Sequence, residues 1–124
     1  MPDRSKLEAF PTPTDTPFVI EHVAEEFTSL CPNTGHPDYG VVHVSFCPRP
    51  GSGGGTCVEL KSLKLYLQSF RDEGAFYEAV TNRIRDDLDA LMSPVWLVVR
   101  TEWRGRGGIR SVITASSGDV PPGR

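Results

Sequence analysis

The sequence predicts an α+β domain in which an antiparallel sheet carries two helices on one face. Apolar residues alternate near both ends of the chain and recur at helical spacing in the middle, which gives the order ββααββ. Pairs of strands on either side of two consecutive helices favour hairpins, and hairpins build an antiparallel sheet. The 124 residues suit one domain with a modest core.

The first two strands are expected over residues 18–27 and 41–46. The second alternates more clearly, with one apolar face formed by Val42, Val44 and Phe46. A glycine run over residues 51–55 then separates strand from helix. This run has neither the Gly-Lys-Ser/Thr ending of a phosphate-binding loop nor the spaced glycines of a dinucleotide fingerprint, so we interpret it as a flexible linker.

The two helices are expected over residues 56–70 and 75–92. Thr56 and Glu59 match a capping box at the start of the first helix. Its apolar side chains at helical spacing are Leu60, Leu63, Leu67 and Phe70. Those of the second helix are Phe76, Val80, Ile84, Leu88 and Leu91. Ser93 and Pro94 end the second helix.

Two further strands, expected over residues 95–103 and 109–115, flank a basic, glycine-rich turn. Both ends of the chain are polar and rich in proline, so we expect a flexible arm over 1–16 and a flexible tail over 117–124. The folded domain is therefore predicted to span residues 17–116.

Composition argues against several classes of protein. The net charge of −3 and the pI of about 5.5 give no overall positive field, so neither nucleic acid nor anionic lipid is an expected partner. No stretch approaches the ~20 apolar residues of a membrane span, and the first residues have no apolar signal core. The three cysteines show no metal-type spacing, which favours a reduced, cytoplasmic protein without a metal.

Residues 31–38, Cys-Pro-Asn-Thr-Gly-His-Pro-Asp, place a thiol and a carboxylate in one turn. A nucleophilic thiol needs a neighbour that manages its proton, and Asp38 can do this for Cys31. Taken alone, the segment fits a structural turn with a buried Cys31 and a surface Asp38 equally well. Cys57 is a rival nucleophile, since it lies at the expected start of a helix, where the pKa of a thiol falls.

Residues 59–66 follow the pattern Glu-x-Lys-Ser-x-Lys-x-Tyr. Together with residues 31–38, this motif resembles the NADPH-dependent 7-cyano-7-deazaguanine reductase (QueF) family of queuosine biosynthesis in its short, single-domain form. The matching run extends from Glu26 to Ile109. The resemblance implies the tunnelling fold (T-fold), in which the sheets of several subunits join into a barrel. It also implies a homo-oligomer, with two stacked rings expected, and active sites between subunits.

The resemblance further implies a reaction and its residues. The family reduces the nitrile 7-cyano-7-deazaguanine (preQ0) to the amine 7-aminomethyl-7-deazaguanine (preQ1) with two NADPH. It would do so here through a thioimide on Cys31, with Asp38 as the proton donor. The implied substrate-binding residues are Val58, Glu59, Leu60, Tyr77 and Glu78. The implied NADPH-binding residues are Lys61 and Lys64, and Arg106 beside two glycines is a third candidate cation.

Some of these residues also have plainer interpretations. Without the resemblance, Glu78 is better explained as an exposed charge on a helix, and each lysine of the motif as a solvated surface residue. Tyr66 is expected to pack rather than react. Tyr77 departs from the family pattern, which commonly has His before the recognition Glu. A tyrosine keeps a hydrogen-bonding tip but does not supply a proton near neutral pH.

Three alternatives to the reductase remain open from the sequence. A related amidinotransferase would form the same thioimide and then accept ammonia on a nitrile-bearing tRNA base, but Lys61, Lys64 and the acidic chain favour reduction. A cyclohydrolase of the same fold class would need metal ligands, for which the His and Cys residues show no arrangement. The third is a non-catalytic oligomer that binds a purine or pterin.

Overall fold

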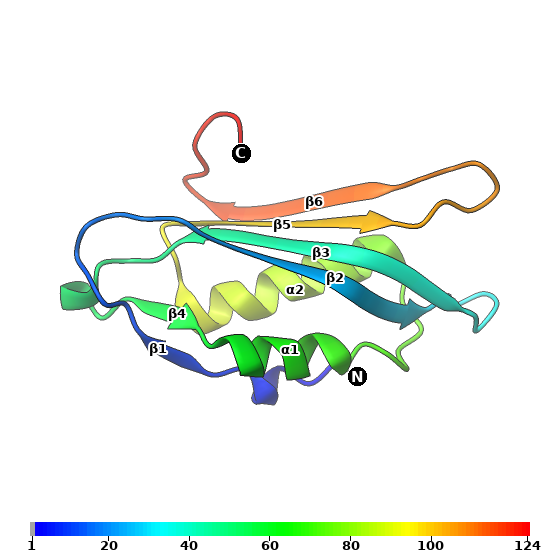
Figure 1. Cartoon of the computed structure of the whole chain (residues 1–124), viewed down its shortest axis with the longest axis horizontal. Helices are drawn as coiled ribbons and strands as arrows, with labels where there is room; N and C mark the ends of the chain where they lie inside the picture. Colours follow the sequence, from blue (N-terminus) through cyan, green and yellow to red (C-terminus); the bar gives the residue numbers. More distant parts are fainter. Residues whose placement is uncertain (1) are drawn as a thin grey trace.

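The computed structural model describes residues 2–124 and has the predicted succession of two strands, two helices and two strands, with short elements added (Figure 1). The elements are η1 Arg4–Lys6, β1 Ala9–Pro11, β2 Ile20–Leu30, β3 Pro37–Cys47, η2 Gly51–Gly53, β4 Thr56–Val58, α1 Leu60–Gln68, α2 Tyr77–Met92, β5 Trp96–Trp103 and β6 Val112–Gly118. The main sheet has the order β2-β3-β5-β6, and every neighbouring pair is antiparallel. Both helices lie on the same side of it, as expected (Figure 1). The α+β prediction is confirmed at this level.

The core lies between the main sheet and the two helices. The predicted apolar face of β3 is confirmed, because Val42, Val44 and Phe46 are all buried. The buried apolar side chains of α2 are Val80, Ile84, Leu88 and Met92, so Met92 rather than the half-buried Leu91 ends the stripe. Phe76 precedes the helix as its N-cap and is exposed, which corrects its assignment to the core.

The first helix starts later than the sequence predicts. The expected capping box at Thr56 is wrong, because that residue begins β4, which pairs with β1. Glu59 is itself the N-cap, and its carboxylate accepts hydrogen bonds from the backbone N–H groups of Lys61 (2.7 Å) and Ser62 (2.8 Å). Leu60, in the first turn, is 61% exposed and therefore does not join the core.

Both ends of the chain, predicted as a loose arm and tail, carry secondary structure or packed side chains. The arm forms η1 and β1, and the backbone N–H groups of Asp3 and Glu8 donate to the hydroxyls of Ser69 (2.9 Å) and Ser62 (3.0 Å). In the tail, β6 continues to Gly118. Val120 packs against a small apolar cluster of Cys47, Trp96 and Val98, at the end of the sheet where β3 ends and β5 begins. The sequence could not reveal these contacts, since their partners lie far away along the chain.

The glycine run after β3 is a packed turn rather than an open linker. It contains η2, and the backbone N–H of Gly51 donates to the carbonyl of Thr14 (3.1 Å). A Cβ atom at Gly51 would lie 2.3 Å from the carbonyl oxygen of Thr12, so this position has no room for a side chain. The glycines therefore allow the turn to contact the arm closely.

Among residues 2–124, no helix combines the length and the hydrophobicity that crossing a membrane requires.

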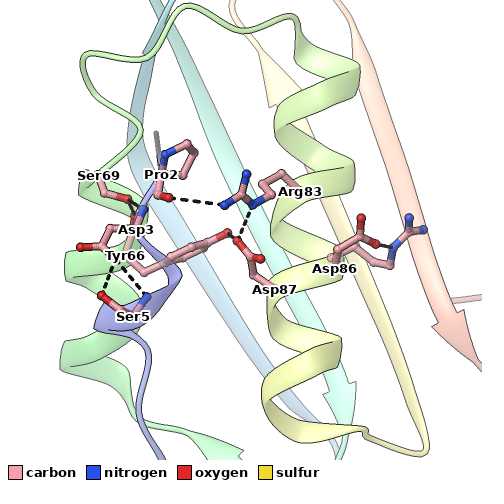
Figure 2. Close-up of polar contacts among 9 residues, drawn as sticks. Pro2, Asp3, Ser5, Tyr66, Ser69, Arg83, Asp86 and Asp87 are labelled. Carbon is pink, nitrogen blue, oxygen red and sulfur yellow. Dashed lines mark hydrogen bonds and ion pairs between the residues drawn. The ribbon is translucent and has the colours of Figure 1, made fainter.

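A buried polar network joins α1 to α2 (Figure 2). The Tyr66 hydroxyl donates to Asp87 Oδ2 (2.5 Å), and Arg83 Nε donates to the same oxygen (2.8 Å). Arg83 also reaches the carbonyl of Pro2 in the arm (3.4 Å). Burial and the Asp87 carboxylate raise the pKa of Tyr66, so the phenol remains a donor. The predicted packing role of Tyr66 is confirmed, and the network fixes α1 and α2 relative to each other.

We expect Asp87→Ala to lower the free energy of unfolding by about 2 kcal/mol, because it removes the charged acceptor of the buried Tyr66 hydroxyl. Asp86→Ala is the matched control, since Asp86 is an exposed carboxylate on the same helix, and its loss should cost less than about 0.5 kcal/mol. Urea unfolding at one fixed protein concentration measures both values. Equal losses in the two variants would show that the network adds nothing to stability.

Candidate active site

The turn between β2 and β3 brings Cys31 and Asp38 together. Cys31 directly follows β2, and Asp38 is the second residue of β3. The backbone N–H of Cys31 donates to the carbonyl of His36 (2.8 Å), and that of Gly35 donates to the carbonyl of Cys31 (2.8 Å). Gly35 has a φ of +71°, a conformation that favours glycine, so the turn closes without strain. His36 is an exposed loop residue, as expected.

A small open pocket of about 190 Å³ surrounds these two side chains. Its lining residues come from the β2–β3 turn, the segment that begins α2 and the β5–β6 loop: Cys31, Pro32, Asp38, Ala75, Phe76, Tyr77, Glu78 and Arg106. Backbone hydrogen bonds between Leu30 and both Glu73 (2.9 Å) and Ala75 (3.1 Å) hold the start of α2 against the end of β2. Three segments far apart in sequence thus form one site, which we call the Cys31 pocket.

Hydrogen bonds prepare the Cys31 thiol for ionisation. The Thr34 hydroxyl, the backbone N–H groups of Asn33 and Thr34, and the Arg106 guanidinium lower the pKa of Cys31 to about 7. A large share of the thiol is therefore a thiolate near neutral pH. Cys57 is not a comparable nucleophile, because it is 1% exposed and lies in β4 rather than at a helix N-terminus. Cys47 is also buried.

Asp38 is nearly buried, with 4% of its surface exposed, and two donors meet at one of its oxygens. Arg106 Nη2 forms an ion pair with Asp38 Oδ1 (2.6 Å), and the Tyr77 hydroxyl donates to the same oxygen (3.3 Å). Burial and the charge of Asp38 raise the pKa of Tyr77, so its phenol remains protonated at neutral and moderately alkaline pH. These contacts hold the carboxyl of Asp38 in a fixed position in the pocket that it shares with the thiol.

The loop that carries Arg106 is a tight hairpin. The backbone N–H and C=O groups of Arg106 and Ile109 bond to each other (2.8 and 2.9 Å), and the intervening Gly107 and Gly108 have φ angles of +56° and +80°. Two consecutive positive φ angles are the signature of a type I′ turn, in which glycine is favoured. The glycines therefore serve the turn, and the turn aims Arg106 at Asp38.

Four of the predicted site residues lie in a second depression. A groove of about 910 Å³ between α1 and β2 is lined by Glu59, Leu60, Lys61 and Lys64, among others, and it shares no residue with the Cys31 pocket. We call it the α1–β2 groove. Val58 opens onto neither depression: it is 2% exposed in the core, and its backbone N–H donates to Met92 Sδ (3.2 Å). Within one chain, the predicted substrate residues are therefore divided between two places.

Sequence reasoning missed the place of Phe76 in the Cys31 pocket, the contact of Arg106 with Asp38 and the effect of Thr34 on the Cys31 thiol. Phe76 was assigned to the core, and Arg106 was expected to contact phosphates rather than Asp38. Thr34 was also missed, although a hydroxyl residue inside the same turn as the cysteine was a usable signal. Among residues 2–124, no three His, Cys, Asp or Glu side chains are grouped so that they could hold a metal ion.

We expect the alkylation rate of Cys31 by iodoacetamide to rise with pH through a midpoint near 7, rather than near the usual cysteine value of 9.0. Thr34→Val removes the largest stabilising hydrogen bond to the thiolate and should raise this midpoint, whereas Thr34→Ser retains the hydroxyl and should not. Peptide mapping by mass spectrometry separates Cys31 from the two buried cysteines. A wild-type midpoint near 9 would show that the thiol is not activated.

Comparisons with known proteins identify the family of this chain. A family model described as QueF-like protein matches residues 37–121. Three relatives are NADPH-dependent 7-cyano-7-deazaguanine reductases. The one from Anaeromyxobacter dehalogenans (strain 2CP-C) is 50% identical over 118 residues (94% of this chain, 93% of the relative). The one from Chlorobium luteolum is 53% identical over 111 residues (89% of this chain, 91% of the relative). The one from Rhodopirellula baltica is 50% identical over 117 residues (94% of this chain, 93% of the relative).

A solved structure shares the fold. The archaeosine synthase QueF-Like in the apo form superposes with a TM-score of 0.71, covering 89% of this chain and 99% of that one, at 21% sequence identity. At that identity the likeness concerns the fold alone, whereas identities near 50% over most of both chains establish kinship. The resemblance stated from the two motifs is confirmed: the chain belongs to the QueF-like family, among the NADPH-dependent 7-cyano-7-deazaguanine reductases.

Proposed function

We propose that this chain is an NADPH-dependent nitrile reductase that converts preQ0 to preQ1 in queuosine biosynthesis. One observation carries the proposal: an activated thiol, Cys31, shares a pocket with Asp38 in a chain about half identical to enzymes that bear the reductase name. A nitrile accepts hydride poorly, and addition of a thiolate turns it into a more electrophilic thioimide. The pocket supplies both the thiolate and a carboxyl group for the proton transfers.

The steps follow from these side chains. Cys31 Sγ attacks the nitrile carbon, and the carboxylate of Asp38 takes up the proton that the Cys31 thiol loses. Asp38 then gives this proton to the nitrile nitrogen, which leaves a neutral thioimide on Cys31. NADPH supplies two hydrides in succession. The first, to the thioimide carbon, lets the C–S bond break and releases Cys31 as thiolate from an imine. The second, with a proton to nitrogen, completes the amine. Two hydrides and two protons thus convert the nitrile to a primary amine.

Arg106 and Tyr77 have supporting roles in this scheme. Both contact Asp38 Oδ1, so we assign proton exchange to Oδ2. Arg106 also hydrogen-bonds Cys31 and favours its thiolate, so we reassign Arg106 from the cofactor phosphates to the reacting pair. Glu78 lines the same pocket, and its carboxylate suits the two parallel N–H groups of a guanine-like edge.

Lys61 and Lys64 are our candidates for the phosphates of NADPH. Both are exposed on α1 and line the α1–β2 groove, where they supply local positive charge in an acidic chain. Glu59 and Leu60 line the same groove and are proposed to contact the substrate. Because Val58 is buried, a role in substrate binding is limited to holding these neighbours in place.

We further propose a homo-oligomer in which the Cys31 pocket of one chain meets the α1–β2 groove of another. Separation of the two residue sets within one chain supports this arrangement. The strands β2 and β6 are the edges of the main sheet, and such edges can pair with another copy. The T-fold barrel of two stacked rings remains our expected form, to be tested by light scattering during size-exclusion chromatography. Three free cysteines fit our proposal of a cytoplasmic enzyme.

Intact-protein mass spectrometry after mixing with preQ0, first without and then with NADPH, tests the function. The reductase gives one adduct on Cys31 that disappears with NADPH as the amine is released. An adduct that persists in NADPH would favour the amidinotransferase alternative, and no adduct at all would favour a non-catalytic binding oligomer.

A further inference from the structure

Tyr77 lies flat against a buried tryptophan. Its ring and that of Trp103 are parallel within 8°, with centroids 4.1 Å apart. Trp103 is 1% exposed and fixed on its other sides, since Phe27 meets it edge-on (5.8 Å between centroids). Gly40 approaches it so closely that an added Cβ would lie 3.0 Å from the indole ring. The indole is therefore a rigid support for the Tyr77 ring.

Two buried threonines connect this stack by hydrogen bonds. The indole N–H of Trp103 donates to Thr101 Oγ1 (2.8 Å), Thr101 Oγ1 lies 2.7 Å from Thr81 Oγ1, and the Thr81 hydroxyl donates to the Tyr77 carbonyl (2.8 Å). Because Thr81 gives its only hydroxyl proton to Tyr77, Thr101 must be the donor between the two threonines. Every hydroxyl then donates one hydrogen bond and accepts another, so the direction of the whole chain is fixed.

The hydrogen bonds and the ring stack form a closed circuit through Tyr77, Trp103, Thr101 and Thr81. Both threonines are completely buried, so water does not compete for their hydrogen bonds. The circuit holds Tyr77 at its backbone carbonyl through Thr81 and at its ring through Trp103. Outside the circuit, the Tyr77 hydroxyl donates to Asp38 Oδ1.

The hydrogen bond to Asp38 is sensitive to the position of the Tyr77 ring. At 3.3 Å it is longer than the usual range of about 2.5–3.0 Å for O–H···O bonds, so a small displacement of the ring breaks it. The tyrosine stands where the family pattern commonly has His, and its reach to Asp38 depends on the plane of its ring. The ring plane is set by Trp103, and Trp103 is oriented by Thr101.

We propose that Thr101, acting through Trp103, and Thr81, acting at the Tyr77 carbonyl, are positioning residues that hold the Tyr77 hydroxyl on the catalytic carboxyl of Asp38. This inference rests on the proposed reductase function. Thr101 touches neither the Cys31 pocket nor the α1–β2 groove, so its influence on the reaction passes through the circuit.

The test compares Thr101→Val, which keeps the shape and loses the hydroxyl, with Thr101→Ser, which keeps the hydroxyl. Thr101→Val should lower kcat for preQ0 reduction about tenfold, the effect of one lost hydrogen bond, with KM nearly unchanged. Thr101→Ser should retain most of the wild-type kcat. Tyr77→Phe, which removes the positioned hydroxyl, should match Thr101→Val. The double variant should be no slower than Tyr77→Phe alone, because both changes act through the same hydroxyl.

Additive losses in the double variant, or a wild-type kcat in Thr101→Val, would overturn the proposal. A readout that needs no turnover separates it from the function itself: ¹⁹F NMR of the chain labelled with fluorotyrosine. The Tyr77 signal, assigned by its loss in Tyr77→Phe, should shift in Thr101→Val and stay in place in Thr101→Ser. Absence of reduction by the wild-type chain contradicts the proposed function, whereas an unmoved Tyr77 signal in Thr101→Val contradicts the positioning role.

Discussion

Cys31→Ala is expected to lose both the covalent adduct with preQ0 and its reduction, the latter by more than about 10⁴-fold, as removal of a catalytic nucleophile does. Without the thiolate, the nitrile is not converted into a thioimide, and hydride has no adequate acceptor. Intact-protein mass spectrometry measures the adduct, and the loss of NADPH absorbance measures reduction. The expected pattern is no mass increase and no turnover.

Cys47→Ala is the matched control, because this cysteine is buried in a separate apolar cluster at the far end of the sheet. It should form the adduct and reduce preQ0 like the wild type. Reduction at the wild-type rate by Cys31→Ala would overturn the thioimide mechanism. An adduct on Cys57 in that variant would transfer the nucleophile to the rival residue.

The sequence was most informative where the chemistry is local. Cys31 and Asp38 lie in one turn, and the turn residues between them bring the two together without help from distant segments. The centre of the α2 stripe, Val80, Ile84 and Leu88, was likewise predictable, since helical spacing alone identifies its buried face. The structure accordingly places both residues in one pocket, whereas the choice of Cys31 over Cys57 rested on the family resemblance.

Predictions that depended on distant partners were less accurate. The start of α1 was placed too early because the residues before it form β4. This strand exists only through its pairing with β1, which lies near the start of the chain. The contact of Arg106 with Asp38 was not predicted, because it depends on how the β5–β6 hairpin folds over the β2–β3 turn. Similarly, the circuit of Tyr77, Trp103, Thr101 and Thr81 joins α2 to β5 and has no signature along the chain.

The division of the predicted site is the main point that sequence motifs cannot express. The family resemblance implied that Val58, Glu59 and Leu60 bind the substrate together with Tyr77 and Glu78. In the structure, Val58 turns into the core, while Glu59, Lys61 and Lys64 line the groove along β2. A sequence motif indicates which residues act in the same active site. It does not indicate whether one copy of the chain or two copies contribute those residues.

We expect Asp38→Asn to separate adduct formation from reduction. The amide has nearly the shape of the carboxyl and keeps an oxygen for the Tyr77 hydroxyl, but it does not act as an acid at neutral pH. The hydrogen bonds that favour the Cys31 thiolate come from Thr34, Asn33 and Arg106, so they remain in the variant. The thiolate should therefore still add to preQ0, with water replacing Asp38 as the source of the proton on nitrogen. Turnover should fall about 10³-fold, a typical effect of losing a general acid.

Mass spectrometry at successive times after mixing measures the adduct, and NADPH consumption measures turnover. Asp119→Asn is the matched control, because this exposed carboxylate lines neither depression, and it should behave as the wild type. If the Asp38→Asn adduct accumulates and persists with NADPH, Asp38 is needed to protonate nitrogen during reduction. Turnover at the wild-type rate would instead assign the proton to another donor. Failure to form the adduct would place the requirement for Asp38 at the addition step, because an amide there would leave the nitrogen of the new thioimide without its proton.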